Sequence, residues 1–83
     1  MKAELMNDEQ RRRYDFCENE LSQVIYKTSG CTVKYYIRNG REIVDIVDGS
    51  GTVVGKVVVT DLDLLALTWD VVVRLYRMSF DPR

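Results

Sequence analysis

The residues that could carry out chemistry in this 83-residue chain are few. The sequence contains no histidine, so it lacks the commonest general base and every triad or Cys-His dyad that depends on imidazole. Cys17 and Cys31 alone cannot supply the four ligands of a structural zinc site. A helix that carries Cys17 away from Cys31 disfavours a disulfide between them. We therefore interpret Cys17 as a small buried apolar residue.

Acidic residues and glycines also fall where they serve structure. Asp61 and Asp63 lie at the expected start of a helix, where carboxylates usually interact with the positive end of the helix dipole rather than with a metal. The five glycines fall at turns, at a helix stop and within one strand, and none forms a phosphate-binding loop before a helix. We expect a non-enzymatic protein with no metal and no cofactor.

Composition and charge set the class of protein. A hydrophobic fraction of 46% with 30% charged residues is ordinary for a folded chain, and the length fits one domain, residues 1–83. The net charge of −1 gives no overall attraction to nucleic acid. Charged residues interrupt the apolar stretch 62–78, and the chain starts without a signal-peptide pattern. Together with two cysteines, this predicts a cytoplasmic protein that spans no membrane.

A helix is predicted over about residues 8–28. Asn7 and Gln10 have the spacing of a capping box, and Gly30 is a natural helix stop. The apolar residues of this segment recur at helical spacing. They are Tyr14, Cys17, Leu21, Val24 and Ile25.

Three strands are predicted over about residues 31–38, 41–48 and 52–59. Asn39 and Gly40 form a strong signal for a two-residue hairpin turn, which fixes the register of the first two strands. The expected pairs are Arg38 with Arg41, Tyr36 with Ile43, Tyr35 with Val44, Lys34 with Asp45 and Val33 with Ile46. In the simplest register of the third strand, Lys56 lies opposite Ile43.

A second helix is predicted over about residues 61–79, with Thr60 as its cap. Because Val71, Val72, Val73 and Tyr76 are good strand formers, a short helix followed by a fourth strand from Asp70 onward is an open alternative. The favoured order is helix, three-stranded antiparallel meander, helix, in a single small α+β domain.

This order of elements resembles that of the double-stranded RNA-binding domain over most of the chain. In that family the second helix begins with lysines that contact RNA phosphates. Residues 60–63, Thr-Asp-Leu-Asp, stand in their place here. Their negative charge would repel phosphates, so the resemblance implies the topology but not the RNA function.

The second predicted helix has two apolar stripes about 100° or more apart on a helical wheel. We expect one stripe to pack on the sheet, namely Leu62, Leu65, Trp69, Val72 and Tyr76. We expect the other to form a self-association or partner surface, since large exposed apolar patches usually mark one. Its residues are Leu64, Leu67, Val71, Leu75 and Met78. The alternative is that the first helix covers part of both stripes and leaves neither exposed.

The outer face of the sheet is predicted to be basic. It combines positive charges with an aromatic ring, the combination that a phosphate backbone and a stacked base require, although an acidic protein surface would fit equally well. A solvated face protected by charge against strand pairing is the simpler alternative. The residues are Lys34, Tyr36, Arg38, Arg41 and Lys56.

From these surfaces we expect a small protein-interaction module, a homodimer through the second helix that also binds a protein partner by occupying its surface. Small proteins without catalytic machinery are often regulators or inhibitors, including those of phages and mobile elements. The alternative is a nucleic-acid-binding module that uses the basic sheet face.

Overall fold

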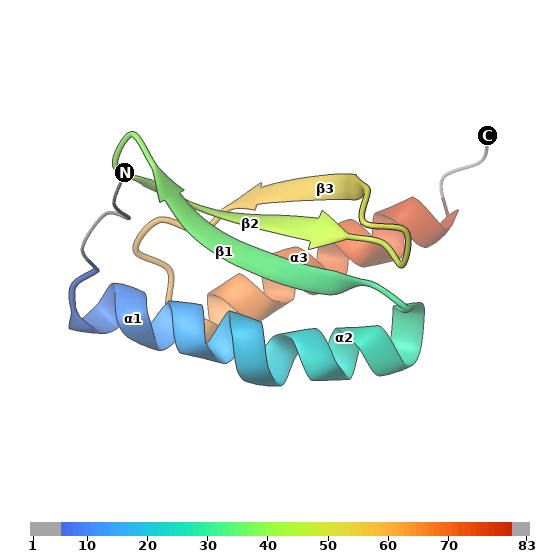
Figure 1. The fold of residues 1–83 in the computed structure, drawn as a ribbon, viewed down its shortest axis with the longest axis horizontal. Helices are drawn as coiled ribbons and strands as arrows, with labels where there is room; N and C mark the ends of the chain where they lie inside the picture. The colour runs from blue at the N-terminus through green and yellow to red at the C-terminus, as the bar shows by residue number, and fades with distance from the viewer. Residues whose placement is uncertain (1–5, 81–83) are drawn as a thin grey trace.

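The structure, a computed structural model, describes residues 6–80 and the side chains of residues 6–78. The chain is an α+β domain in which a helical segment precedes a three-stranded antiparallel sheet and a last helix follows it (Figure 1). This confirms the predicted fold class. The elements are α1 (Asp8–Asp15), η1 (Phe16–Leu21), α2 (Ser22–Ser29), β1 (Thr32–Arg38), β2 (Arg41–Val47), β3 (Val53–Val58) and α3 (Leu64–Phe80).

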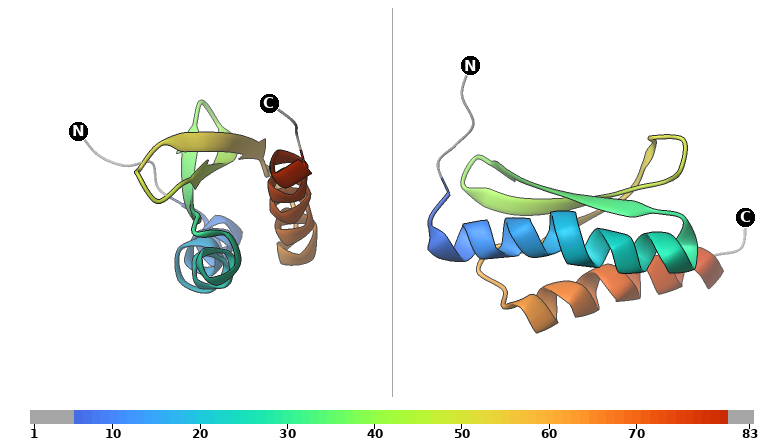
Figure 2. Two further views of the ribbon diagram at one scale, coloured as in Figure 1. Left: turned by 90° about the vertical axis from the view of Figure 1, so that its right-hand side faces the viewer. Right: turned by 60° about the horizontal axis from the view of Figure 1, so that its bottom comes forward.

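The elements form two layers. The first helical segment and α3 both lie on one face of the sheet, the former beneath β1 and the latter toward β3 (Figures 1 and 2). The core lies between the layers. Among residues 6–80, no helix lies over the other face of the sheet (Figure 2).

The first helical segment runs without a break from Asp8 to Ser29, and its middle, η1, is a π-helix. The capping box of Asn7 and Gln10 is present, and Gly30 ends α2 with φ 78°, as predicted. The buried residues recur every four positions, a spacing that drifts about 40° per step around an ideal α-helix. The wider π turn offsets this drift and keeps the buried residues on one face. They are Arg13, Cys17, Leu21 and Ile25.

Val24, predicted to lie on the same apolar face, is instead 61% exposed. Because one residue is buried every four positions, the core position after Leu21 falls at Ile25, the residue next to Val24. Val24 therefore points to solvent.

The hairpin register of β1 and β2 is confirmed pair by pair. Asn39 and Gly40 both have positive φ, 53° and 78°, as a type I′ turn requires. The prediction for Lys56 was wrong in register: it pairs with Asp45, because Ile43 pairs with Val58. A register shift also lies between Ile46 and Val47. Lys56 nonetheless lies on the predicted face, since Asp45 and Ile43 share it.

Residues 64–80 form one helix, α3, so the alternative of a fourth strand from Asp70 was wrong. The helix also starts later than predicted. Asp63, rather than Thr60, provides the cap, because its carboxylate accepts a hydrogen bond of 2.8 Å from the N–H of Ala66. The Thr60 hydroxyl oxygen instead accepts the N–H of Glu42 at 3.0 Å.

Gly55 lets α3 approach the sheet closely. A β-carbon at this position would lie 3.2 Å from the Ile46 side chain and 3.4 Å from Arg74 and from Met78 of α3. No helix in the described part of the chain is long and apolar enough to cross a membrane.

We predict that Gly55→Val destabilises the fold by about 1–3 kcal/mol, because the added methyl groups must push α3 or Ile46 away. Urea unfolding measures the change. Val58→Thr is the control: Val58 is 52% exposed on the open face of the sheet, so we expect a change within about 0.5 kcal/mol. Equal midpoints for Gly55→Val and the parent would contradict the close contact between α3 and β3.

Candidate functional site

The most concentrated chemistry in the structure is a buried polar cluster between α1 and the sheet. The Arg13 guanidinium donates to both carboxylate oxygens of Glu42, from Nε at 2.5 Å and from Nη2 at 2.9 Å. The Tyr35 hydroxyl donates to Glu42 Oε1 at 2.6 Å, and the N–H of Asp61 donates to Oε2 at 3.0 Å. Arg13 is 5% exposed and Glu42 0%.

The Glu42 carboxylate of this cluster has no acceptor site left for a substrate. Four donors already bind the Glu42 carboxylate, and among residues 6–78 no buried side-chain nitrogen or oxygen lacks a partner. Although burial raises the pKa of Glu42, the hydrogen bonds from Arg13, Tyr35 and Asp61 lower it further, so the net pKa lies below its ordinary value. A carboxylate with a low pKa is a poor general base. The cluster is therefore a structural connection, which we call the Arg13–Glu42 clamp.

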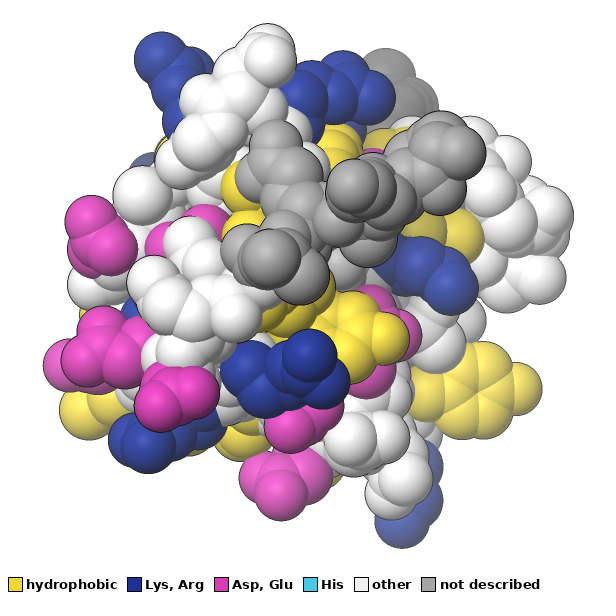
Figure 3. Space-filling view, turned by 60° about the vertical axis from the view of Figure 1, so that its left-hand side comes forward, with side chains coloured by type: hydrophobic (Ala, Val, Ile, Leu, Met, Phe, Trp, Pro, Cys, Tyr) yellow, Lys and Arg dark blue, Asp and Glu magenta, His cyan; other side chains and the backbone are white. Residues whose placement is uncertain are grey.

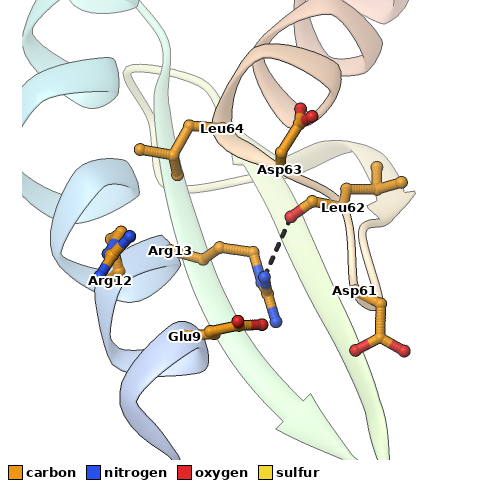
Figure 4. A pocket seen from close by; sticks show the side chains of 7 residues that line it. All are labelled: Glu9, Arg12, Arg13, Asp61, Leu62, Asp63 and Leu64. Carbon is orange, nitrogen blue, oxygen red and sulfur yellow. Dashed lines mark hydrogen bonds between the residues drawn. The ribbon is translucent and has the colours of Figure 1, made fainter.

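A shallow pocket of about 300 Å³ lies next to the clamp, between α1 and the segment that leads into α3 (Figure 4). Arg13 reaches into it and donates from Nη1 to the carbonyl oxygen of Leu62 at 3.0 Å. Glu9 lies beside Arg13 in this view, and Asp61 and Asp63 point away from it (Figure 4). Because the guanidinium is engaged by Glu42 and Leu62, the pocket offers no free cation from Arg13.

Sequence reasoning missed this clamp. Arg13 lies in the run Arg11-Arg12-Arg13 among acidic residues, a pattern typical of a solvated helix face, whereas Arg13 is buried. The available signal was the register: Glu42 pairs with Ile37, which places it on the core-facing side of β2. A carboxylate expected on a core face requires a cationic partner, and Arg13 is that partner.

The basic residues of the outer sheet face are brought together as predicted, but part of their charge is neutralised. Lys56 Nζ lies 2.7 Å from Asp45 Oδ1 and donates to the Tyr36 hydroxyl at 2.9 Å. The Tyr36 hydroxyl in turn donates to Asp45 at 3.2 Å. The hydrogen bonds from Lys56 to Asp45 and to Tyr36 raise the pKa of Lys56. Asp45 therefore neutralises part of the charge of Lys56, whose side chain is 53% exposed.

Three cations of this face, Lys34, Arg38 and Arg41, are exposed. Arg38 lies over the Tyr36 ring at 5.8 Å from its centroid. On the face of the molecule that Figure 3 shows, acidic and basic side chains are interspersed: magenta groups lie toward the left and bottom and near the centre, and blue groups at the top, centre and lower edge. The view in Figure 3 shows no single-sign patch.

The prediction for the two apolar stripes of α3 was wrong: the stripe predicted to be exposed is the buried one, and the stripe predicted to be buried is the exposed one. Leu67 and Val71, assigned to a free surface, are completely buried. Leu64, Leu75 and Met78 are half-buried, and Met78 Sδ would lie 3.4 Å from a β-carbon added at Gly55. The stripe expected to pack on the sheet is the exposed one: Leu65 is 81% exposed, Trp69 66%, Val72 42% and Tyr76 63%. Leu62 is half-buried beside the core. We call Leu65, Trp69, Val72 and Tyr76 the outward ridge.

The cysteines contribute no site. Cys17 and Cys31 are both free thiols and buried, and burial raises the pKa of Cys17 to about 12. Within the described residues, no group of three or more His, Cys, Asp or Glu side chains is arranged to hold a metal ion.

No family model, no curated protein and no solved structure matches this chain.

We predict that Arg13→Leu destabilises the protein by about 3–5 kcal/mol, because it leaves the buried Glu42 carboxylate without its cation. Arg12→Leu, the exposed neighbour on the same helix, is the matched control and should change the stability by less than about 0.5 kcal/mol. Chemical denaturation of both variants measures the difference. Equal stabilities would show that the clamp contributes nothing.

The clamp also predicts that the stability of the folded protein falls in acid. Since the pKa of Glu42 is lower in the folded protein than the ordinary 4.5, the unfolded chain binds the proton more readily below that pH. The stabilisation is therefore complete above pH 4.5 and is lost as the pH falls through the folded pKa. Glu42→Gln should unfold with a shallower dependence on pH below 4.5. An identical acid profile in this variant and the parent would exclude Glu42 as a source of the dependence.

Proposed function

We propose that this chain is a non-enzymatic protein-interaction module whose docking surface is the outward ridge of α3. The observation that supports it is the exposure of four large apolar side chains in one row, with Trp69 at the centre and 66% exposed. Contiguous exposed apolar patches usually mark interaction sites, and Trp and Tyr are enriched among residues that dominate binding energy.

The spacing of the ridge favours another helix as the contacting element. Leu65, Trp69, Val72 and Tyr76 are separated by four, three and four positions, the a/d spacing of a helix–helix seam. A second copy of this chain supplies such a helix. The proposed assembly is therefore a homodimer in which the two α3 helices face each other.

The charges of α3 favour an antiparallel arrangement of the two helices. Asp63 and Asp70 lie in the first half of the segment, and Arg74 and Arg77 lie in the second. An antiparallel pair places Asp63 of each copy near Arg77 of the other, whereas a parallel pair would align like charges. Antiparallel helix dipoles add to this preference.

In this proposal the module acts by occupying a surface of a protein partner, as a regulator or inhibitor. A cytoplasmic location fits two free cysteines, because thiols persist in a reducing compartment. The dimer would present two copies of every remaining surface to that partner, which raises binding by avidity.

Sedimentation equilibrium tests the dimer. We expect the parent to sediment with twice the mass of the chain, and Leu65→Asp to sediment as a monomer with an unchanged unfolding midpoint, since Leu65 is 81% exposed. Val24→Asp, at an apolar residue of α2 that is 61% exposed, is the matched control and should remain a dimer. A monomeric parent, or a dimeric Leu65→Asp variant, would contradict the proposal.

Nucleic-acid binding is the second candidate, and the observation that favours it is the stacking of Arg38 on Tyr36 beside exposed Lys34 and Arg41. Because Asp45 already neutralises Lys56, fewer cations are available than the sequence predicted. If this function holds, a single-stranded oligonucleotide binds at low salt, and the combined change Arg38→Ser and Arg41→Ser abolishes binding. No binding by the parent at low salt would exclude it.

A further inference from the structure

The two edges of the sheet differ in whether their hydrogen-bonding groups are occupied. At the β1 edge, the Ser22 hydroxyl accepts the N–H of Val33 and donates to its carbonyl oxygen, both at 3.0 Å. The Glu18 carboxylate accepts the N–H of Tyr35 at 3.1 Å. Side chains of the first helical segment therefore close this edge to another strand.

The β3 edge is open. Val59 donates its N–H to the carbonyl oxygen of Glu42 at 2.8 Å, and in an antiparallel ladder the direction alternates along the strand. Gly55 and Val57 therefore also face β2, while the N–H and C=O groups of Lys56 and Val58 face outward. Among the residues that the structure describes, no hydrogen bond occupies these outward groups. An open edge of this kind is a template for an added strand.

A groove of about 280 Å³ accompanies this open edge. Its lining comes from α3 and from one strand residue, Val57 of β3: Val57, Trp69, Asp70, Val73, Arg74 and Arg77. Since β3 is the edge strand and α3 lies toward it (Figure 2), the groove opens beside the outward backbone groups. Its lining combines three apolar side chains, Val57, Trp69 and Val73, with two arginines and one aspartate, which gives it a net positive charge.

We propose that the β3 edge binds an extended segment of a protein partner that adds to the sheet as a fourth strand and carries acidic and β-branched side chains. The backbone of the segment would bond the outward groups of Lys56 and Val58, and main-chain bonds of this type give affinity in strand addition while side-chain pockets give specificity. Alternate side chains of the segment would enter the groove, where an acidic group meets Arg74 or Arg77 and an apolar group meets Val57 and Val73.

The charge of the groove argues against a second copy of β3 as the occupant. A two-fold pairing of β3 with itself would bring Arg74 and Arg77 of both copies to the same side of the joined sheet, and like charges in proximity oppose association. An acidic segment removes this repulsion. The site is separate from the outward ridge apart from Trp69, so its failure and that of the proposed homodimer are distinguishable.

The test is a selection of phage-displayed random peptides of about eight residues, the length of a strand, against the parent protein. We expect selected sequences rich in Val, Ile and Thr with Asp or Glu at alternate positions. Synthetic copies should slow amide hydrogen exchange at Lys56 and Val58. No selected sequence above background, or sequences rich in Lys and Arg, would overturn the proposal.

Two variants locate the binding. Val58→Pro removes one outward N–H and leaves the hydrogen bonds to β2 in place. Proline is tolerated at the outer side of an edge strand. The variant should bind the selected peptides about tenfold or more weakly than the parent does. Val58→Thr keeps the N–H and is the control. Arg77→Glu should weaken acidic peptides by a similar factor without any backbone change, so the proposal stays testable if the proline variant does not fold.

Two further results would overturn it. Peptides that bind Val58→Pro and Arg77→Glu as tightly as the parent occupy some other surface. If the amide hydrogens of Lys56 and Val58 exchange slowly without peptide, and this protection disappears when the protein is diluted, a second copy covers the edge. Leu65→Asp should bind the peptides as the parent does, whatever its oligomeric state.

Discussion

The rest of the structure depends on the Arg13–Glu42 clamp. One ion pair, with the Tyr35 hydroxyl and the backbone of Asp61 and Leu62, joins α1, β1, β2 and the segment that leads into α3. Charged groups this deeply buried are tolerated only when their hydrogen bonds are complete. Here the bonds come from three parts of the chain that are distant in sequence: α1, the hairpin of β1 and β2, and residues 61–62. The clamp therefore specifies how these parts are arranged.

The position of α3 follows from this arrangement. The clamp holds residues 61 and 62, Asp63 caps the helix directly afterwards, and the absence of a side chain at Gly55 admits Arg74 and Met78 against β3. These contacts set the rotation of the helix, burying Leu67 and Val71 and leaving the outward ridge exposed. The same placement opens the groove between Val57 and Arg77 at the free sheet edge. Both candidate interaction surfaces therefore depend on the position and rotation of α3 on the sheet.

The sequence predicted the topology and the register of the first hairpin, because an Asn-Gly turn admits one geometry and the strand period follows from it. It could not predict the rotation of α3. Both stripes of that helix are apolar, so composition does not separate them; the choice depends on the space at Gly55 and on Arg74 crossing the strand there. One residue of the clamp could be predicted, since the register places Glu42 on the core face. Its partner Arg13 could not, because it belongs to a run of three arginines of which it alone is buried.

In the proposed homodimer, a second α3 covers the outward ridge. Trp69 is the only tryptophan of the chain, so its fluorescence during serial dilution measures this directly. We expect a blue-shifted emission at high concentration that moves to the red on dilution, as the dimer dissociates and Trp69 reaches its 66% exposure. Red emission that does not change with concentration would contradict it.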